Sequence, residues 1–336
     1  MTAAAVLLGY AAAAGTMGAK ALARARWLDR APLLAAITYL AAAWSAVAAA
    51  GLAGLTLAVH ATALGGALSQ LIGACVIRLR DTYATPGGAA VAGAGLVLAS
   101  LIAARVTLTA ARQLRTARRL ARQHAQTARL IGRLDPAMGA VLVEHPQPMA
   151  YCVAGRQPTV IVTSGALRAL DPGQVEAVLA HERAHLTWHH HQLLALARIS
   201  HRALPFVPLM RAAEAQVQRL VEMHADDTAT QMRDPRSLAS ALVVLATAAA
   251  AAPAQSGTAQ SGTAQPGTPP SATSVLGSVA TDAAHRIGRL LRPAEPLRGS
   301  RRLLLRTVTA ALVLGPPAIA LIPALLALAL GRVPHA

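Results

Sequence analysis

The chain has 336 residues, of which 54% are hydrophobic but only 13% are charged, and its formal net charge is +17. Water-soluble domains carry about 25% charged residues, so this composition excludes a fully soluble globular enzyme and indicates segments that face lipid. The two cysteines, Cys75 and Cys152, fall in regions that we place on opposite sides of the membrane, which excludes a disulfide framework.

Four apolar stretches are long enough to cross a hydrocarbon core, which takes about 20 helical residues. They cover about 3–19, 31–58, 88–111 and 307–330. No Lys or Arg precedes Lys20, so the first stretch lacks the basic region of a signal peptide and is expected to remain as a span. The segment 61–77 is also apolar but contains three glycines, and we expect a loop or an interfacial helix there.

The distribution of basic residues predicts the orientation of the spans. The connection between the first two spans carries four Lys and Arg residues at 20–30, whereas the next connection carries two arginines beside Asp81. Further arginines follow the third span and precede the fourth, at 112–133 and 286–306. We therefore expect the region between the third and fourth spans at the cytoplasmic face, with the N- and C-termini outside.

The same arginines account for the high net charge, because basic residues beside spans attract anionic lipid. A nucleic-acid-binding face would carry aromatic side chains among the arginines, and 112–133 contains no Phe, Tyr or Trp. We expect membrane lipid as a partner and no direct nucleic-acid partner.

Residues 112–134 are predicted to extend the third span as a polar helix that Pro136 ends. β-rich runs between Val141 and Val162 predict a small sheet of two or three strands. Asp171 followed by Pro172 is typical of a helix start, and this helix can continue to about residue 203. Two further helices are predicted at about 208–232 and 236–251.

A low-complexity segment follows these helices. The unit Ala-Gln-Ser-Gly-Thr appears three times between Ala254 and Thr268, with Pro266 in place of one Ser. Such a composition cannot bury a core, so we predict a disordered linker over 252–281. An amphipathic piece at 284–291 then leads to the fourth span.

The residues with the clearest chemistry are His181, Glu182 and His185, which form a His-Glu-x-x-His motif inside the helix that begins at Pro172. Four residues advance an α-helix by about 400°, so both imidazoles leave the same face and can bind one zinc ion. Glu182 is offset by about 100° and is placed to act as a general base on water. A catalytic zinc site needs a third protein ligand.

Two residues compete for the third position. His191 lies ten residues after His181, as in metzincins, but that arrangement needs a glycine at 188, where this chain has Trp188. A helix that continues through Trp188 turns His191 away from the metal. His189 lies on the metal stripe but about 6 Å further along the axis, so the run 189–191 is interpreted as a polar helix face or an adventitious metal-binding run.

Glu222 on the following helix is the better candidate, because gluzincins complete their site with a carboxylate from an antiparallel neighbouring helix. Asp226 lies one turn later on the same face, where it could accept the free N–H of a zinc-bound imidazole. Ala225 would let the two helices approach closely. We expect His224 and Asp227 at the surface.

Residues 148–186, together with the run from Glu222 to Asp226, resemble the membrane metallopeptidases of the BlaR/MecR antirepressor family and, more distantly, the HtpX and CAAX-prenyl endopeptidase group. The resemblance implies that His181, His185 and Glu222 bind zinc and that Glu182 is the general base. It also implies that an edge strand ahead of the zinc helix aligns the substrate. We predict that 159–163 is this strand, with Val160 and Val162 as substrate-binding residues. The antirepressor sensors carry a penicillin-binding domain after their last span, so for a chain ending at residue 336 β-lactam sensing is not expected.

The predicted fold is a mostly α integral membrane protein of four transmembrane helices, with an α+β gluzincin-type zinc peptidase domain inserted between the third and the fourth. The expected parts are three spans at 1–111, an Arg-rich juxtamembrane helix at 112–135, the peptidase domain at 136–251, the linker at 252–281, an amphipathic juxtamembrane segment at 282–302, and the fourth span with a short tail at 303–336.

The predicted function is that of a membrane zinc endopeptidase with one Zn²⁺ per chain. Its partner is a protein substrate, with a transcriptional repressor or an anti-sigma factor as the regulatory candidates. Two alternatives are a quality-control protease of membrane proteins and a non-proteolytic, zinc-binding membrane regulator.

Overall fold

The computed structural model describes residues 2–59, 88–155, 157–251 and 283–330. Four of its helices are long and apolar enough to cross a membrane, with candidate spans at Ala3–Ala23, Pro32–Leu57, Gly93–Gln123 and Gly299–Ile322. All four predicted spans are therefore found. The predictions for 61–77 and 252–281 lie outside the described residues.

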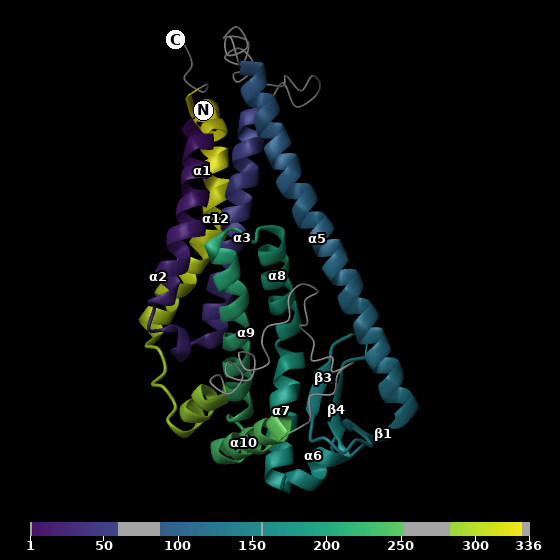
Figure 1. Ribbon diagram of the computed structural model, residues 1–336. Coiled ribbons are helices and arrows are strands. Elements are labelled where there is room, and N and C mark those ends of the chain that lie inside the picture. The colour runs from purple at the N-terminus through teal and green to yellow at the C-terminus, as the bar shows by residue number, and fades with distance from the viewer. Residues whose placement is uncertain (1, 60–87, 156, 252–282, 331–336) are drawn as a thin grey trace.

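The first candidate span consists of α1 (Thr2–Ala13), the π-helical turn η1 (Ala14–Gly18) and α2 (Ala19–Ala23). The second is α3 (Pro32–Val59), reached through the short helix η2 (Leu28–Arg30), and the fourth is α12 (Gly299–Leu330). Helices α1, α3 and α12 lie side by side, and the start of α1 lies at the same end as the finish of α12 (Figure 1). The sheet and the zinc helix lie at the opposite end.

The third candidate span belongs to α5 (Gly88–Ile131), a single helix of 44 residues. At 1.5 Å per residue it is about 66 Å long, roughly twice the thickness of a hydrocarbon core. The predicted polar extension of the span is thus part of the same helix. It ends before Pro136, however, because residues 132–135 form a strand that the sequence did not predict.

The sheet contains four strands among the described residues: β1 (Gly132–Asp135), β2 (Ala140–Val143), β3 (Ala150–Val153) and β4 (Thr159–Thr163). Their order is β1-β2-β4-β3, with β2 and β4 parallel and the other two pairs antiparallel. The prediction that 159–163 is an edge strand is wrong. β4 is a central strand, and its residues Val160 and Val162 are 3% and 2% exposed because both faces are covered.

The helices beside the sheet are α6 (Ser164–Ala169), α7 (Pro172–Thr187), α8 (His190–Ala203), α9 (Pro208–Ala229) and α10 (Pro235–Ala251). The predicted single helix from 172 to 203 is interrupted. His189 takes a left-handed conformation with a φ of 51°, which ends α7 and starts α8 in a new direction.

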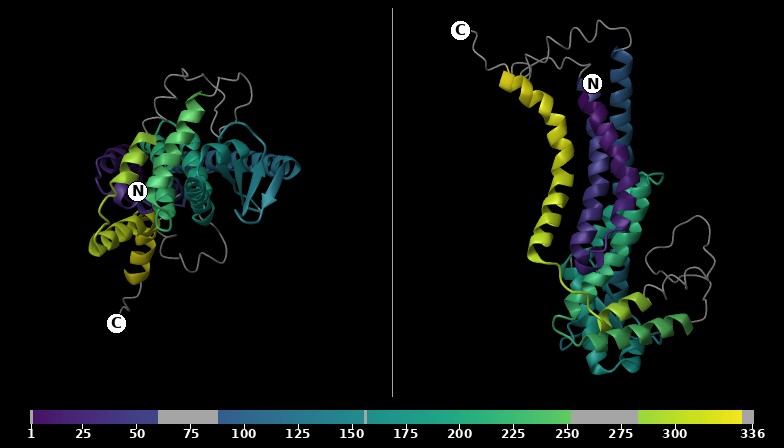
Figure 2. Two further views of the ribbon diagram at one scale, coloured as in Figure 1. Left: turned by 90° about the horizontal axis from the view of Figure 1, so that it is seen from below. Right: turned by 90° about the vertical axis from the view of Figure 1, so that its left-hand side faces the viewer.

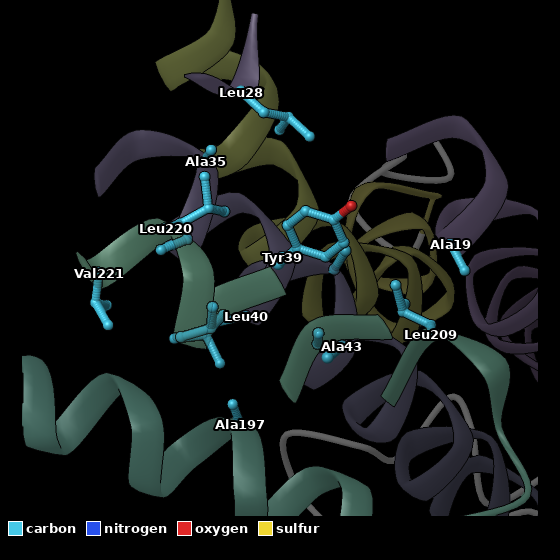
Figure 3. Close-up of a cluster of buried hydrophobic side chains, with 14 of the residues drawn as sticks. Ala19, Leu28, Ala35, Tyr39, Leu40, Ala43, Ala197, Leu209, Leu220 and Val221 are labelled. Carbon is cyan, nitrogen blue, oxygen red and sulfur yellow. The ribbon is translucent and has the colours of Figure 1, made fainter. Parts of the chain in front are cut away.

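Two hydrophobic cores hold these elements. One joins α7 to the sheet, to α10 and to the helical segment 283–291. The other joins the antiparallel hairpin of α8 and α9 to α3, where Tyr39, Leu40 and Ala43 meet Leu209 and Leu220 (Figure 3). Helices α8 and α9 are therefore packed directly on a candidate membrane span.

Candidate metal centre

Helix α7 fixes the direction of the two motif histidines. Asp171 caps its first turn by accepting a hydrogen bond from the Gln174 N–H, while the Gln174 side chain accepts one from the Asp171 N–H. With Pro172 as its first residue, the helix begins as predicted. The rings of His181 and His185, one turn apart, have centroids 4.8 Å from each other.

Glu222 from α9 completes a cluster of three metal-binding side chains. His181 Nε2 and His185 Nε2 are 3.1 Å apart, and they lie 3.5 Å and 3.6 Å from the two carboxylate oxygens of Glu222. One ligand atom from each residue lies within 4.8 Å of the others. α7 and α9 pack against each other, which brings together residues 41 positions apart.

These separations fit one tetrahedral zinc ion. With zinc–nitrogen and zinc–oxygen bonds of about 2.0–2.1 Å, two ligand atoms at a tetrahedral centre lie about 3.3 Å apart. Two imidazoles and one carboxylate also leave the fourth position open, as catalytic rather than structural zinc sites do. The donor set and its spacing therefore suit a catalytic zinc.

The charges around the cluster favour a cation. Burial alone would lower the pKa of His181, but hydrogen bonds to Asp226 and Glu222 raise it to about 9. Burial would raise the pKa of Glu222, yet His181 and Arg286 hold it well below its usual range, so Glu222 is ionised. Without a metal the site thus retains a proton on His181, and a divalent cation satisfies the same demand for positive charge.

Asp226 contacts the side of the His181 ring that faces away from Glu222. Its Oδ1 lies 3.0 Å from His181 Nδ1, the ring nitrogen that does not face Glu222, and its side chain is only 1% exposed. Arg286 donates two hydrogen bonds to the same carboxylate, from Nε at 2.8 Å and from a terminal nitrogen at 2.7 Å. The other terminal nitrogen of Arg286 lies 3.0 Å from Glu222. One guanidinium therefore orients both carboxylates.

Glu182 is turned toward β3, the edge strand that packs against α7. Burial raises the pKa of its carboxyl group, and the Cys152 thiol donates a hydrogen bond to it. Burial and the nearby Glu182 raise the pKa of Cys152 to about 12, so the thiol keeps its proton. Cys152 is thus a hydrogen-bond donor to Glu182 and not a metal ligand.

The histidines after the motif are arranged differently from the polar helix face that was predicted. His190 is completely buried, with Nδ1 3.0 Å from His185 Nδ1 and Nε2 3.0 Å from His224 Nδ1. Burial and the neighbouring His185 lower the pKa of His190 to about 3, so its ring is neutral. His224, expected at the surface, packs edge-on against Trp188. His191 is exposed and is no part of the cluster, as predicted, although the reason is the break at 189 and not a continuous helix.

The comparisons with known proteins agree with this chemistry. The model of Peptidase family M48 matches residues 114–215. Over these residues the chain is similar to the M48 peptidases, which are zinc metallopeptidases and therefore hydrolases. The sequence matches no curated protein and no solved structure. The match agrees with the more distant of the two resemblances, to the HtpX group, and does not specify a BlaR/MecR subtype.

The residues that match family M48 overlap the third candidate span. The match begins at residue 114, inside α5, whose candidate span extends to Gln123. The matched region and the third candidate span therefore share α5, so the span does not lie wholly before the matched region. Glu222 lies beyond the matched residues, and its place in the cluster rests on the geometry alone.

The sequence did not identify two residues that contact the metal-binding cluster. Arg286 was counted among the membrane-facing arginines, but its side chain is only 15% exposed and contacts Glu222 and Asp226. Nothing in the sequence marks it, because its partners lie about 60 residues earlier. His190 was grouped with its neighbours, and the signal that could have singled it out is its position five residues after His185.

Proposed function

We propose that the chain is a multi-pass membrane endopeptidase in which His181, His185 and Glu222 hold one zinc ion. The observation that carries this proposal is the three-residue cluster, with separations of 3.1 to 3.6 Å and an open fourth position, in a chain that matches family M48. When bound, zinc supplies a Lewis acid that polarises the peptide carbonyl and lowers the pKa of water.

Glu182 is the general base in this proposal. It lies one position after His181, on the side of α7 that faces β3, and burial keeps the pKa of its carboxyl group above the usual value. A carboxylate with a raised pKa accepts a proton from the attacking water more readily and can return it to the leaving amine. Cys152 on β3 is the neighbour that contacts Glu182 from the sheet.

Asp226 and Arg286 hold the ligands in place. With Nε2 of His181 directed at the metal, its proton sits on Nδ1, and the Asp226 carboxylate accepts it at 3.0 Å. In the same way, His190 Nδ1 accepts a hydrogen bond from the Nδ1–H of His185. The Nε2–H of His190 then donates a hydrogen bond to His224 Nδ1. Both zinc-binding imidazoles are thereby fixed in one tautomer and one orientation.

The substrate is a protein, and β3 is the strand that would align it. β3 is an edge of the sheet and lies beside α7, so an extended peptide added to that edge runs past Glu182. The Lys and Arg distribution supports a cytoplasmic location for the catalytic end, with the start of α1 and the end of α12 at the outer face.

The Glu182→Gln variant tests the mechanism. It keeps the shape and hydrogen bonding of the side chain but removes the base, so we expect zinc to remain at one equivalent per chain while peptide cleavage falls below detection. Glu176→Gln is the matched control, because Glu176 lies on the same helix, is 56% exposed and pairs with Arg233. If Glu182→Gln cleaves as fast as the control, Glu182 is not the base.

The proposed role is regulatory cleavage, as the resemblance to the antirepressor peptidases suggests, with a repressor or anti-sigma factor as substrate. Proteomics of cells that carry the Glu182→Gln variant distinguishes this role from quality control. One accumulating protein supports regulation, whereas many accumulating membrane proteins support quality control. An unchanged phenotype in that strain supports a non-proteolytic zinc-binding regulator instead.

A further inference from the structure

The turn between α8 and α9 carries apolar side chains that the described part of the protein leaves uncovered. Residues 203–210 read Ala-Leu-Pro-Phe-Val-Pro-Leu-Met and contain no charge, while Arg202 and Arg211 stand at either side. Phe206, at the centre of the turn, is 73% exposed, and Leu196 on α8 is 40% exposed. Transfer of such a largely exposed aromatic ring from water to an apolar environment is favourable.

The neighbours of this turn belong to the candidate membrane spans. The Val207 side chain packs directly against Gly15 of the first span, and Leu209 packs against Gly18. On the other side, the Arg105 side chain of α5 donates a hydrogen bond to the backbone carbonyl of Ala203. Figure 1 and Figure 2 both place the turn alongside α1 and away from the sheet.

Two spans give the same depth for the turn. Gly15 lies five residues before Lys20, and Arg105 lies seven residues before Arg112, where the basic ends of these spans begin. At 1.5 Å per residue these intervals correspond to about 8 Å and about 10 Å inside the apolar part of the helices. The turn is therefore level with the apolar part of both candidate spans, a little beyond their basic ends.

The charges of the hairpin fit this position. Arg105 is the single charged residue within 88–111, and it meets the carbonyl end of α8, where the helix dipole is negative. Below the turn, Glu214 of α9 is paired with His201 at 2.5 Å and faces Arg198 at 4.0 Å. Arg202 and Arg211 are long enough to extend toward the headgroups.

We propose that the α8–α9 turn is a membrane-inserted element whose partner is the acyl chains of the catalytic-side leaflet, with Phe206 in contact with lipid. Because α9 is one helix, this insertion also sets the height of the metal centre. Glu222 lies 13 residues from Leu209, about 20 Å along the axis, and therefore close to the membrane surface. This inference goes beyond the proposed function and does not depend on catalysis.

Phe206→Trp and Met232→Trp test the insertion as a matched pair. Both residues are strongly exposed, at 73% and 83%, and they lie just beyond opposite ends of α9. Exposure alone predicts the same access to water for both, whereas insertion predicts opposite behaviour. The full chain is reconstituted into phosphatidylcholine and phosphatidylglycerol vesicles, and the fluorescence of the parent protein, with its three tryptophans, is subtracted.

For Phe206→Trp we expect brominated phosphatidylcholine to quench the added fluorescence by roughly half or more, while acrylamide has little effect. For Met232→Trp we expect quenching by acrylamide and not by brominated lipid. Acrylamide quenching of Phe206→Trp equal to that of Met232→Trp overturns the proposal. So does shielding of Phe206→Trp from both quenchers, which indicates a protein partner or a second copy. Far-ultraviolet circular dichroism and the thermal unfolding midpoint of both variants, compared with those of the parent protein, verify that each is folded.

Discussion

Asp226 is not one of the three ligand residues, but we expect zinc binding to depend on it because it holds the ring of His181. It contacts His181 at 3.0 Å and is 1% exposed, so its charge is fully committed to the ring and to Arg286. Asp226→Asn keeps the size of the side chain but lowers its basicity, and we expect roughly 10–100-fold weaker zinc binding. Competition with a chelator of known affinity measures this change.

The neighbouring residue supplies the control for that measurement. Asp227→Asn makes the same chemical change one position later, where the carboxylate is 38% exposed and pairs with Arg289. We expect its zinc affinity to stay within about twofold of the parent, because Asp227 pairs with Arg289 and not with any of the three ligand residues. Equal losses in the two variants contradict a specific role for Asp226.

Because Arg286 is largely buried, we expect its substitution to lower the stability of the protein. Arg286→Gln leaves the buried Asp226 carboxylate without its guanidinium partner, and breaking such a pair costs about 3–5 kcal/mol. Arg286→Lys retains the charge but cannot form two parallel hydrogen bonds to the carboxylate, so we expect an intermediate loss. Thermal unfolding of the zinc-free protein in detergent measures both.

Arg292→Gln is the matched control, because Arg292 follows the same helical segment and is exposed. We expect its unfolding midpoint to match that of the parent. If the unfolding midpoint of Arg286→Gln is as high as that of Arg292→Gln, the pairing of Arg286 with Asp226 and Glu222 does not stabilise the fold.

The His-Glu-x-x-His motif shows what could be predicted at the scale of single residues. Its spacing is local, so the shared face of His181 and His185 followed from helix geometry alone, and Glu222 followed from the expectation of a neighbouring helix. Arg286 could not be found in this way. Its position depends on how the segment 283–291 packs against α9, and the free energy of that pairing is distributed over two elements far apart in the chain.

At the scale of elements, the break between α7 and α8 is the largest departure from the prediction. The sequence contains no Gly or Pro between 173 and 205, so its residue types favour one helix. A His in the left-handed region instead ends α7, and the new direction of α8 turns His190 inward to His185. Tertiary contacts of the hairpin with α3 outweigh the local cost of this conformation.

The steric penalty of the left-handed backbone at His189 leads to a prediction for substitutions there. His189→Gly removes the steric penalty of a positive φ, and we expect it to stabilise the protein by up to about 1 kcal/mol. His189→Ile increases the penalty and should destabilise by roughly 1–2 kcal/mol. The unfolding midpoints of the two variants in detergent, compared with that of the parent, give the sign of each effect.

His191→Ile is the control for side-chain type, since His191 is exposed and lies in the regular part of α8. We expect a change in its midpoint much smaller than that of His189→Ile. Similar destabilisation by both isoleucines means that the left-handed backbone at 189 is not the cause.

At the scale of the whole molecule, α3 and α5 approach closely at the end far from the metal centre and diverge toward it, with α8 and α9 between them (Figure 1). The close approach depends on two glycines. A methyl group at Gly54 would lie 2.5 Å from the Gly95 carbonyl oxygen, and one at Gly95 would lie 2.6 Å from the Leu57 side chain. Small residues at such crossings are typical of membrane helices.

Gly95→Ala therefore forces α5 away from α3, and we expect a loss of roughly 1–3 kcal/mol of stability. Because α5 also packs against α8, the same shift should reach the hairpin and lower the temperature at which bound zinc is lost. Gly93→Ala, two residues earlier on α5, is the control, because an added methyl group there meets nothing within 4 Å. Zinc release followed during heating of both variants measures the coupling, and release at the same temperature in both refutes the proposed dependence of the metal centre on the α3–α5 crossing.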